Sequence, residues 1–128
     1  MGRLFDGVSA LLGIKDYNDY EGQCAIMLED AAANPEAGEA NRLALEFHHR
    51  VAQMILDTCL KIRKETGADQ VALTGGVFQN KILMEKSLEL LRDNGFAPYY
   101  NVSVSPNDGG IALGQAYIAM KLKEAGQL

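Results

Sequence analysis

Two glycine-containing turns hold the polar residues that could bind a ligand. The first lies in VALTGGVFQN at residues 71–80, where an apolar run ends in a glycine pair and polar residues follow. At the end of a buried strand, glycines let the backbone approach a ligand, and the N–H groups that open the next helix favour phosphate. The stretch matches neither the P-loop nor GxGxxG, and a glycine pair between strand and helix is often only a tight turn. These residues leave both interpretations open.

The second turn is SPNDGG at residues 105–110. If the strands before the two turns are parallel neighbours, their C-terminal ends lie on one edge of the sheet, which is where ligands bind in open α/β folds. Asn80 and Asp108 then face a common crevice although they are 28 positions apart.

An aspartate beside phosphates needs an explanation, because like charges in a half-buried cleft repel by roughly several kcal/mol. One explanation is that Asp108 caps the last helix, helped by Asn107. The other is that a cation lies between the carboxylate and the phosphate, since hard cations bind both kinds of oxygen. The spacing alone does not choose between a cap and a metal ligand.

Other polar residues favour structural roles. His48 and His49 are adjacent on a predicted helix and point about 100° apart, so they do not readily share a metal, and each is expected to be a packed or boundary histidine. No CxxC or HxxxH spacing occurs, so the chain has no self-contained zinc site. Several acids are expected on a solvated face: Glu29, Asp30, Glu36 and Glu39.

The apolar periodicity predicts the elements that position these turns. Helices are expected over about 3–13, 23–33, 39–65, 80–94 and 110–124, with a buried strand at 70–74 and an extended segment at 96–104. The longest helix shows a stripe of apolar residues: Leu43, Phe47, Val51, Ile55, Cys59 and Ile62. The C-terminal half therefore predicts a right-handed parallel βαβ unit. Two strands are few for a parallel sheet, so the chain resembles either part of a larger unit or a helical module with a small sheet.

Composition bounds the class of protein. The chain has 128 residues, of which 48% are hydrophobic and 23% charged, as expected for one globular domain. The net charge of -5 argues against nucleic acid or an anionic membrane as a partner. Cys24 and Cys59 are expected to be reduced thiols. With no visible signal peptide and no apolar run of membrane-spanning length, the protein is expected to be cytoplasmic.

Five motifs, in order along the chain, resemble the C-terminal end of the hydrogenase-maturation carbamoyltransferases, the HypF family. They are MGRLFDGVSALLG, YEGQCAIMLE, LEFHHRVA, LTGGVFQNKILME and SPNDGGIALGQA. The chain is more distantly similar to the tRNA threonylcarbamoyltransferases and the antibiotic O-carbamoyltransferases. The resemblance implies a helix-rich α/β fold, the C-terminal part of an actin/hexokinase/Hsp70-like (ribonuclease H-like) nucleotide-binding lobe with a small parallel βαβ unit.

The resemblance also implies a function. Family members make carbamoyl adenylate from ATP and carbamoyl phosphate in another domain, and this lobe helps to hold the adenylate. The carbamoyl group then passes to the C-terminal cysteine of the partner protein HypE, on the route to the cyanide ligands of nickel-iron hydrogenase. The matching positions are Gly2, Asp6, Gly75, Gly76, Val77 and Asn80 for the nucleotide and Asp108 for a divalent metal; no catalytic residue is assigned.

One departure from the family pattern is large. The family's metal site also needs a histidine pair from a preceding segment, and this chain has no HxxxH. The chain is therefore expected to be a single domain over 1–128, a fragment or truncated homologue that forms half a site and is inactive alone. The alternative is a stand-alone nucleotide-binding or partner-docking module without transferase activity. An apolar face left exposed by a missing lobe would favour a homo-oligomer.

Overall fold

The N-terminal half of the chain is helical, as predicted. The computed structural model describes residues 1–127. Helices α1 (Gly2–Leu11) and α2 (Gln23–Ala32) pack on each other, and the 3₁₀ turn η1 (Pro35–Ala37) leads into the long helix α3 (Glu39–Thr66). Gly67 ends α3 in the left-handed conformation, with φ of 75°, as a C-terminal glycine commonly does.

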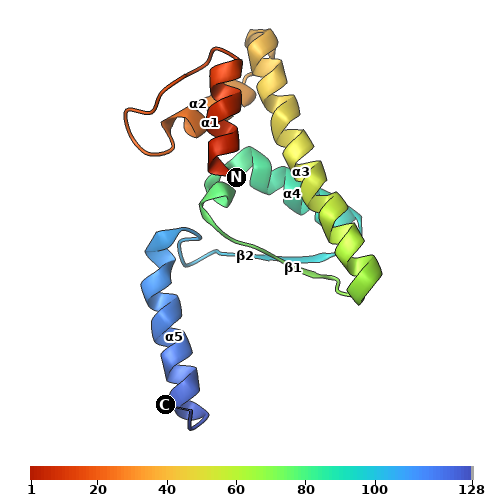
Figure 1. The fold of residues 1–128 in the computed structure, drawn as a ribbon. Coiled ribbons are helices and arrows are strands. Elements are labelled where there is room, and N and C mark those ends of the chain that lie inside the picture. The colour runs from red at the N-terminus through yellow and green to blue at the C-terminus, as the bar shows by residue number, and fades with distance from the viewer. Residues whose placement is uncertain (128) are drawn as a thin grey trace.

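The C-terminal half contains the predicted βαβ unit. Its elements are β1 (Gln70–Leu73), the 3₁₀ turn η2 (Gly76–Gln79), α4 (Lys81–Asp93), β2 (Ala97–Tyr100), the 3₁₀ turn η3 (Asp108–Gly110) and α5 (Ile111–Glu124). Strands β1 and β2 are parallel, in a register that runs from Gln70 opposite Ala97 to Leu73 opposite Tyr100. Helix α4 packs against α3, so the unit is joined to the helical half through these two helices (Figure 1).

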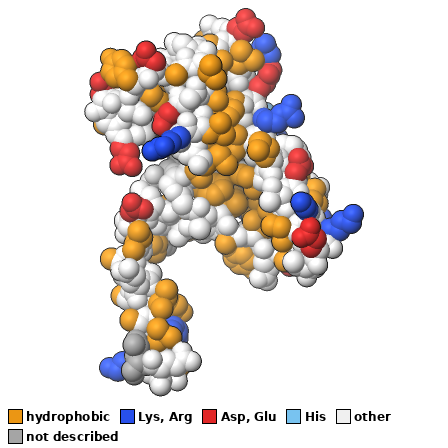
Figure 2. All heavy atoms as spheres, viewed as in Figure 1, with side chains coloured by type: hydrophobic (Ala, Val, Ile, Leu, Met, Phe, Trp, Pro, Cys, Tyr) orange, Lys and Arg blue, Asp and Glu red, His pale blue; other side chains and the backbone are white. Residues whose placement is uncertain are grey.

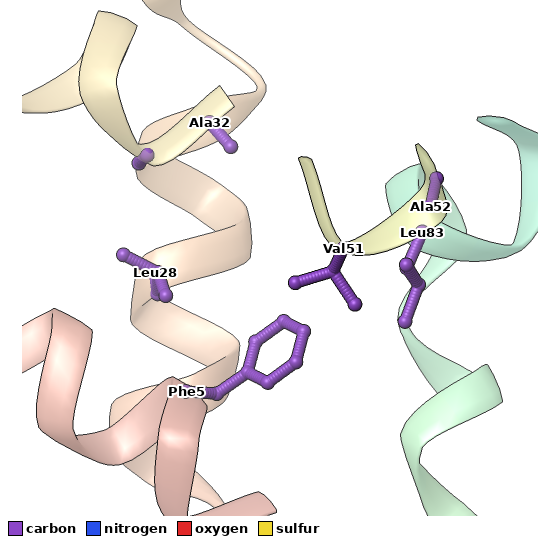
Figure 3. Close-up of a cluster of buried hydrophobic side chains, with 7 residues drawn as sticks. Phe5, Leu28, Ala32, Val51, Ala52 and Leu83 are labelled. Atoms are coloured by element: carbon purple, nitrogen blue, oxygen red, sulfur yellow. The ribbon is translucent and has the colours of Figure 1, made fainter. Parts of the chain in front are cut away.

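The main core lies where α1, α2, α3 and α4 meet. Its buried members are Phe5, Leu28, Ala32, Ala44, Val51, Ala52 and Leu83. Figure 3 shows the Phe5 ring from α1 lying between Leu28 of α2 and Val51 of α3. A second cluster joins α3 and α4 to the sheet and consists of Leu56, Leu73, Leu88, Leu91 and Phe96.

The buried face of α3 differs from the predicted stripe. Val51 is buried as expected, but most of the predicted stripe is only half-buried and Ile62 is 47% exposed. The fully buried residues of α3 are Ala44, His48, Val51, Ala52 and Leu56. Small side chains at 44 and 52 let the neighbouring helices approach closely, so the large apolar residues lie on the flank of the contact rather than at its centre.

The prediction that the first strand is buried is wrong for this chain. In β1 only Leu73 is fully buried: Val71 and Leu73 face α3 and α4, whereas Gln70 and Ala72, on the opposite face of the two-stranded sheet, are exposed. Of the predicted extended segment 96–104, only Ala97–Tyr100 forms a strand.

Helix α5 extends away from the rest of the chain and has no buried residue (Figure 1). Its exposed apolar residues are Ile111, Leu113, Tyr117, Ile118 and Met120. Figure 2 shows apolar side chains on this projecting helix. Surface of this kind is usually covered in a native assembly.

Candidate functional site

A cleft of about 820 Å³ lies between the helical half and the two glycine turns. It is lined by four segments: the start of α1, the residues that open α2, the turn from β1 into α4, and the turn before α5. The predicted site residues that line it are Gly2, Gly76, Val77, Asn80 and Asp108. Asp6 and Gly75 are outside the lining.

The two glycine turns meet, as the parallel arrangement of the strands predicts. The Gly75 N–H donates a hydrogen bond to the carbonyl oxygen of Pro106, with N and O 2.9 Å apart. Gly75 has φ of 103°, a conformation that a side chain disfavours, and a Cβ on Gly110 would collide with the Ser105 carbonyl. The backbone conformation at Gly75 and the close contact at Gly110 therefore each require glycine, whether or not a ligand binds.

The first turn presents open N–H groups. The amides of Gly76 and Val77 form no hydrogen bond with any of residues 1–127, as expected for the start of a helical turn. At the start of α4, two amides are occupied: Leu83 N–H donates to Asn80 Oδ1 at 2.8 Å, and Lys81 N–H donates to Glu29 Oε1 at 2.6 Å. The N–H groups of Gly76 and Val77, which line the cleft, are available to an anion.

The second turn separates the two interpretations of Asp108. Asn107 caps the 3₁₀ turn η3 that leads into α5: its Oδ1 accepts from Gly109 N–H at 2.9 Å and from Ser105 Oγ at 2.6 Å, while α5 itself follows Gly110 without a side-chain cap. The Asp108 carboxylate is exposed and bonds to no other residue in the described part of the chain. Since the capping role is filled by its neighbour, Asp108 remains free to bind something else.

The charged residues that line the cleft are all acids: Glu21, Glu29 and Asp108. An anionic ligand would be repelled by roughly 4 kcal/mol per unit charge at 4 Å and an effective dielectric constant near 20, unless a cation were bound with it. Within residues 1–127 no group of three His, Cys, Asp or Glu side chains is placed to hold a metal. Asp108 therefore fits a metal site only as a single ligand among others.

The structure corrects the prediction for Glu29. It was expected on a solvated face with Asp30, but it is half-buried, lines the cleft, and accepts the hydrogen bond from the backbone of Lys81. An acid spaced 52 residues from its partner gives no sequence signal for this contact.

His48 is fully buried, as predicted for a packed histidine, whereas His49 is exposed. Burial is the main cause that lowers the pKa of His48 from its ordinary value of 6.5. Its Nε2 lies 2.9 Å from the Asn80 side-chain nitrogen, a contact between residues 32 positions apart that no sequence pattern indicates. The side of the cleft formed by α2 and the residues before it is not among the predicted site residues. It consists of Glu21, Gly22, Ala25 and Ile26, which fall within the YEGQCAIMLE motif.

Comparison with known proteins identifies the family. The family described as "Carbamoyltransferase, Kae1-like Domain, second subdomain" matches residues 1–40 and 35–115. The chain is 36% identical to carbamoyltransferase HypF of Rhodobacter capsulatus, over 92% of this chain and 19% of that protein. It is 28% identical to carbamoyltransferase HypF of Synechocystis sp., over 97% of this chain and 20% of that protein.

A solved structure agrees. A crystal structure of full-length HypF in the phosphate- and nucleotide-bound form superposes with a TM-score of 0.85 and 34% identity, over 99% of this chain and 21% of that one. The chain therefore belongs to the HypF carbamoyltransferase family, as the second subdomain of its Kae1-like domain. The chain spans about a fifth of the length of these relatives. Within the described residues, no helix is both long enough and apolar enough to cross a membrane.

Proposed function

We propose that the residues lining the cleft form one wall of the nucleotide site of a HypF-type carbamoyltransferase, which binds ATP or carbamoyl adenylate. The observation that supports this most directly is the convergence of Gly2, the Gly76–Asn80 turn and Asp108 on one cleft from three distant segments. The similar full-length HypF structure was solved in a nucleotide-bound form, which agrees with the proposal.

The proposed roles follow from the chemistry of each group. The N–H groups of Gly76 and Val77 bind phosphate oxygens, and the Asn80 carboxamide forms a hydrogen bond to the nucleotide. Asp108 is one ligand of a divalent cation, which would supply the positive charge that this acidic cleft lacks. Gly2 leaves room at the start of α1, since a Cβ there meets nothing within 4 Å.

The proposed reaction of the whole protein is carbamoyl transfer to the C-terminal cysteine of HypE in nickel-iron hydrogenase maturation. This chain contributes nucleotide and metal contacts, and it is inactive alone because the other metal ligands and the adenylate-forming domain belong to the rest of the parent enzyme. In this proposal residues 1–128 act as one domain of a longer carbamoyltransferase.

The test is a calorimetric titration of the chain with ATP and with a carbamoyl adenylate analogue, each with and without Mg²⁺. We expect weak binding that Mg²⁺ strengthens, and Asp108→Ala should remove most of the Mg²⁺ effect. Asp93→Ala is the matched control, since Asp93 is an exposed aspartate at the end of α4 and does not line the cleft. Asn80→Ala should weaken binding about two- to tenfold, the value of one hydrogen bond.

Two outcomes would change the conclusion. Absence of any binding to the wild-type chain, together with full transfer activity of Asn80→Ala and Asp108→Ala in the parent enzyme, would refute the site. Tight binding that is independent of all other domains, with no transfer when those domains are added, would favour the stand-alone binding module instead.

A further inference from the structure

The hydrogen bonds of the buried His48 ring define its tautomer. Nδ1 lies 2.7 Å from the carbonyl oxygen of Ala44, and Nε2 lies 2.9 Å from Nδ2 of Asn80. A carbonyl oxygen only accepts, so Nδ1 bears the proton. In the neutral ring Nε2 then has a lone pair, which accepts from the Asn80 amide.

The Asn80 carboxamide is held by two bonds of opposite sense. Its Oδ1 accepts from Leu83 N–H at 2.8 Å, while its Nδ2 donates to His48. A flipped amide would place the NH₂ group against the Leu83 N–H and the oxygen against the Nε2 lone pair, and both contacts would be repulsive. One Nδ2–H remains, and it is the donor that this side chain has left for a ligand in the cleft.

The ring is itself held in place by aromatic neighbours. Phe5 and Phe47 pack edge-on against His48, with ring centroids 5.3 and 5.8 Å away and interplanar angles of 76° and 78°. Phe5 also lines the cleft, so the packed cluster of Phe5, Phe47 and His48 extends from the core to the wall of the site. Burial lowers the pKa of His48, which keeps the ring in the neutral form that accepts from Asn80.

We propose that His48 is a positioning residue for the nucleotide: it holds the Asn80 carboxamide in the one orientation that offers the remaining Nδ2–H to the ligand. This inference rests on the proposed role of Asn80 in nucleotide binding. His48 acts through Asn80 and does not line the cleft itself.

A matched pair of substitutions isolates the acceptor at Nε2. His48→Gln places an amide oxygen near the position of Nε2, whereas His48→Asn reaches only to the position of Nδ1. Both remove the ring from its contacts with Phe5 and Phe47, and Asn also leaves a space about one methylene group larger than Gln does. His49→Asn is the exposed neighbouring control.

The affinity for ATP in the presence of Mg²⁺ is measured first. We expect His48→Gln to bind within about twofold of wild type and His48→Asn to bind about three- to tenfold more weakly, the value of a single hydrogen bond. The double variant His48→Asn/Asn80→Ala should bind no more weakly than Asn80→Ala alone, because two residues that act through one contact are not additive. Multiplied losses in the double variant, or equal weakening by Gln and Asn, would overturn the proposal.

A second measurement does not depend on the nucleotide. In the ¹⁵N-labelled wild-type chain, a scalar coupling across the hydrogen bond between His48 Nε2 and Asn80 Nδ2 should be detectable. The Asn80 side-chain amide resonances should be retained in His48→Gln and displaced in His48→Asn. If wild type binds no nucleotide, the proposed function fails, and these resonances still decide whether His48 orients Asn80. Absence of the coupling, or resonances unchanged in His48→Asn, would overturn the inference.

Discussion

Asn80→Asp is the substitution that most directly tests the geometry around His48. The introduced carboxylate can still accept from Leu83 N–H, so the cap of α4 is preserved. Its second oxygen replaces the NH₂ group that now donates to Nε2 of His48, 2.9 Å away. Two acceptors then face each other unless the ring takes up a proton and donates a charge-assisted hydrogen bond.

The expected result is a reversal in how stability depends on pH. In wild type, burial lowers the pKa of His48 below its ordinary value of 6.5; the hydrogen bond to the Ala44 carbonyl and the charge of Glu29 oppose this to a smaller extent, and His49 adds slightly to it. The unfolded state therefore binds more protons just below pH 6.5, and the free energy of unfolding falls as the pH drops through that window. In Asn80→Asp the folded pKa should lie above the unfolded value, so stability falls as the pH rises through the folded pKa.

The magnitude follows from one proton. The titration of His48 can change the free energy of unfolding by at most about 1.4 kcal/mol per pH unit, and the change has opposite signs in wild type and Asn80→Asp. At high pH the variant should be less stable by roughly 1–3 kcal/mol, because a buried acceptor is left without a donor. The assay is urea unfolding at intervals from about pH 5 to about pH 8.5, a range in which a buried histidine titrates.

Subtracting the two curves removes the contribution of every other titrating group that they share. The control is Asn80→Asp in a His48→Gln background, where the slope assigned to the imidazole should disappear. Parallel curves for wild type and Asn80→Asp would refute the reasoning, since they would show that His48 does not face residue 80.

Three further predictions concern other parts of the chain. Gly110→Ala should disorder the second turn and weaken ATP binding, because its Cβ would collide with the Ser105 carbonyl. Gly114→Ala should instead stabilise α5 by about 0.5–1 kcal/mol, because a Cβ there meets nothing within 4 Å. Calorimetry measures ATP binding, and thermal unfolding measures the stability of both variants. Ser87→Ala should leave stability unchanged or raise it by up to about 1 kcal/mol in urea unfolding, because the buried Ser87 hydroxyl has no partner among residues 1–127; a loss above this size would indicate a hydrogen bond. The exposed apolar face of α5 should cause concentration-dependent association, which Ile118→Glu should reduce in light scattering, whereas a monomeric wild type at all concentrations would contradict this.

Local sequence patterns predicted the elements well, because helix and strand signals depend on near neighbours. Gly67 and Gly95 adopt positive φ just after α3 and α4, as glycines at the C-terminal ends of helices commonly do. The strand, glycine turn and helix order also predicted that the two turns meet on one sheet edge, and the Gly75–Pro106 hydrogen bond confirms that they do.

Burial was predicted less well, because it depends on what each face meets. The large apolar residues of α3 lie beside the contact that the smaller Ala44 and Ala52 make possible. The segment 70–74 is predicted to be a buried strand, yet in β1 only Leu73 is fully buried, because α3 and α4 pack on one face of the two-stranded sheet and the opposite face is exposed.

By itself, the sequence determined the helices, the parallel βαβ unit and the family, because those depend on local periodicity and on motifs that are contiguous along the chain. The structure was needed to show that Asn107 rather than Asp108 caps the turn before α5, although that contact is local; only the tertiary structure decided that Glu29 bonds to the start of α4 and that His48 contacts Asn80. The last two contacts join residues 52 and 32 positions apart. No periodicity links such residues, and their partnership exists only once α2, α3 and α4 have packed.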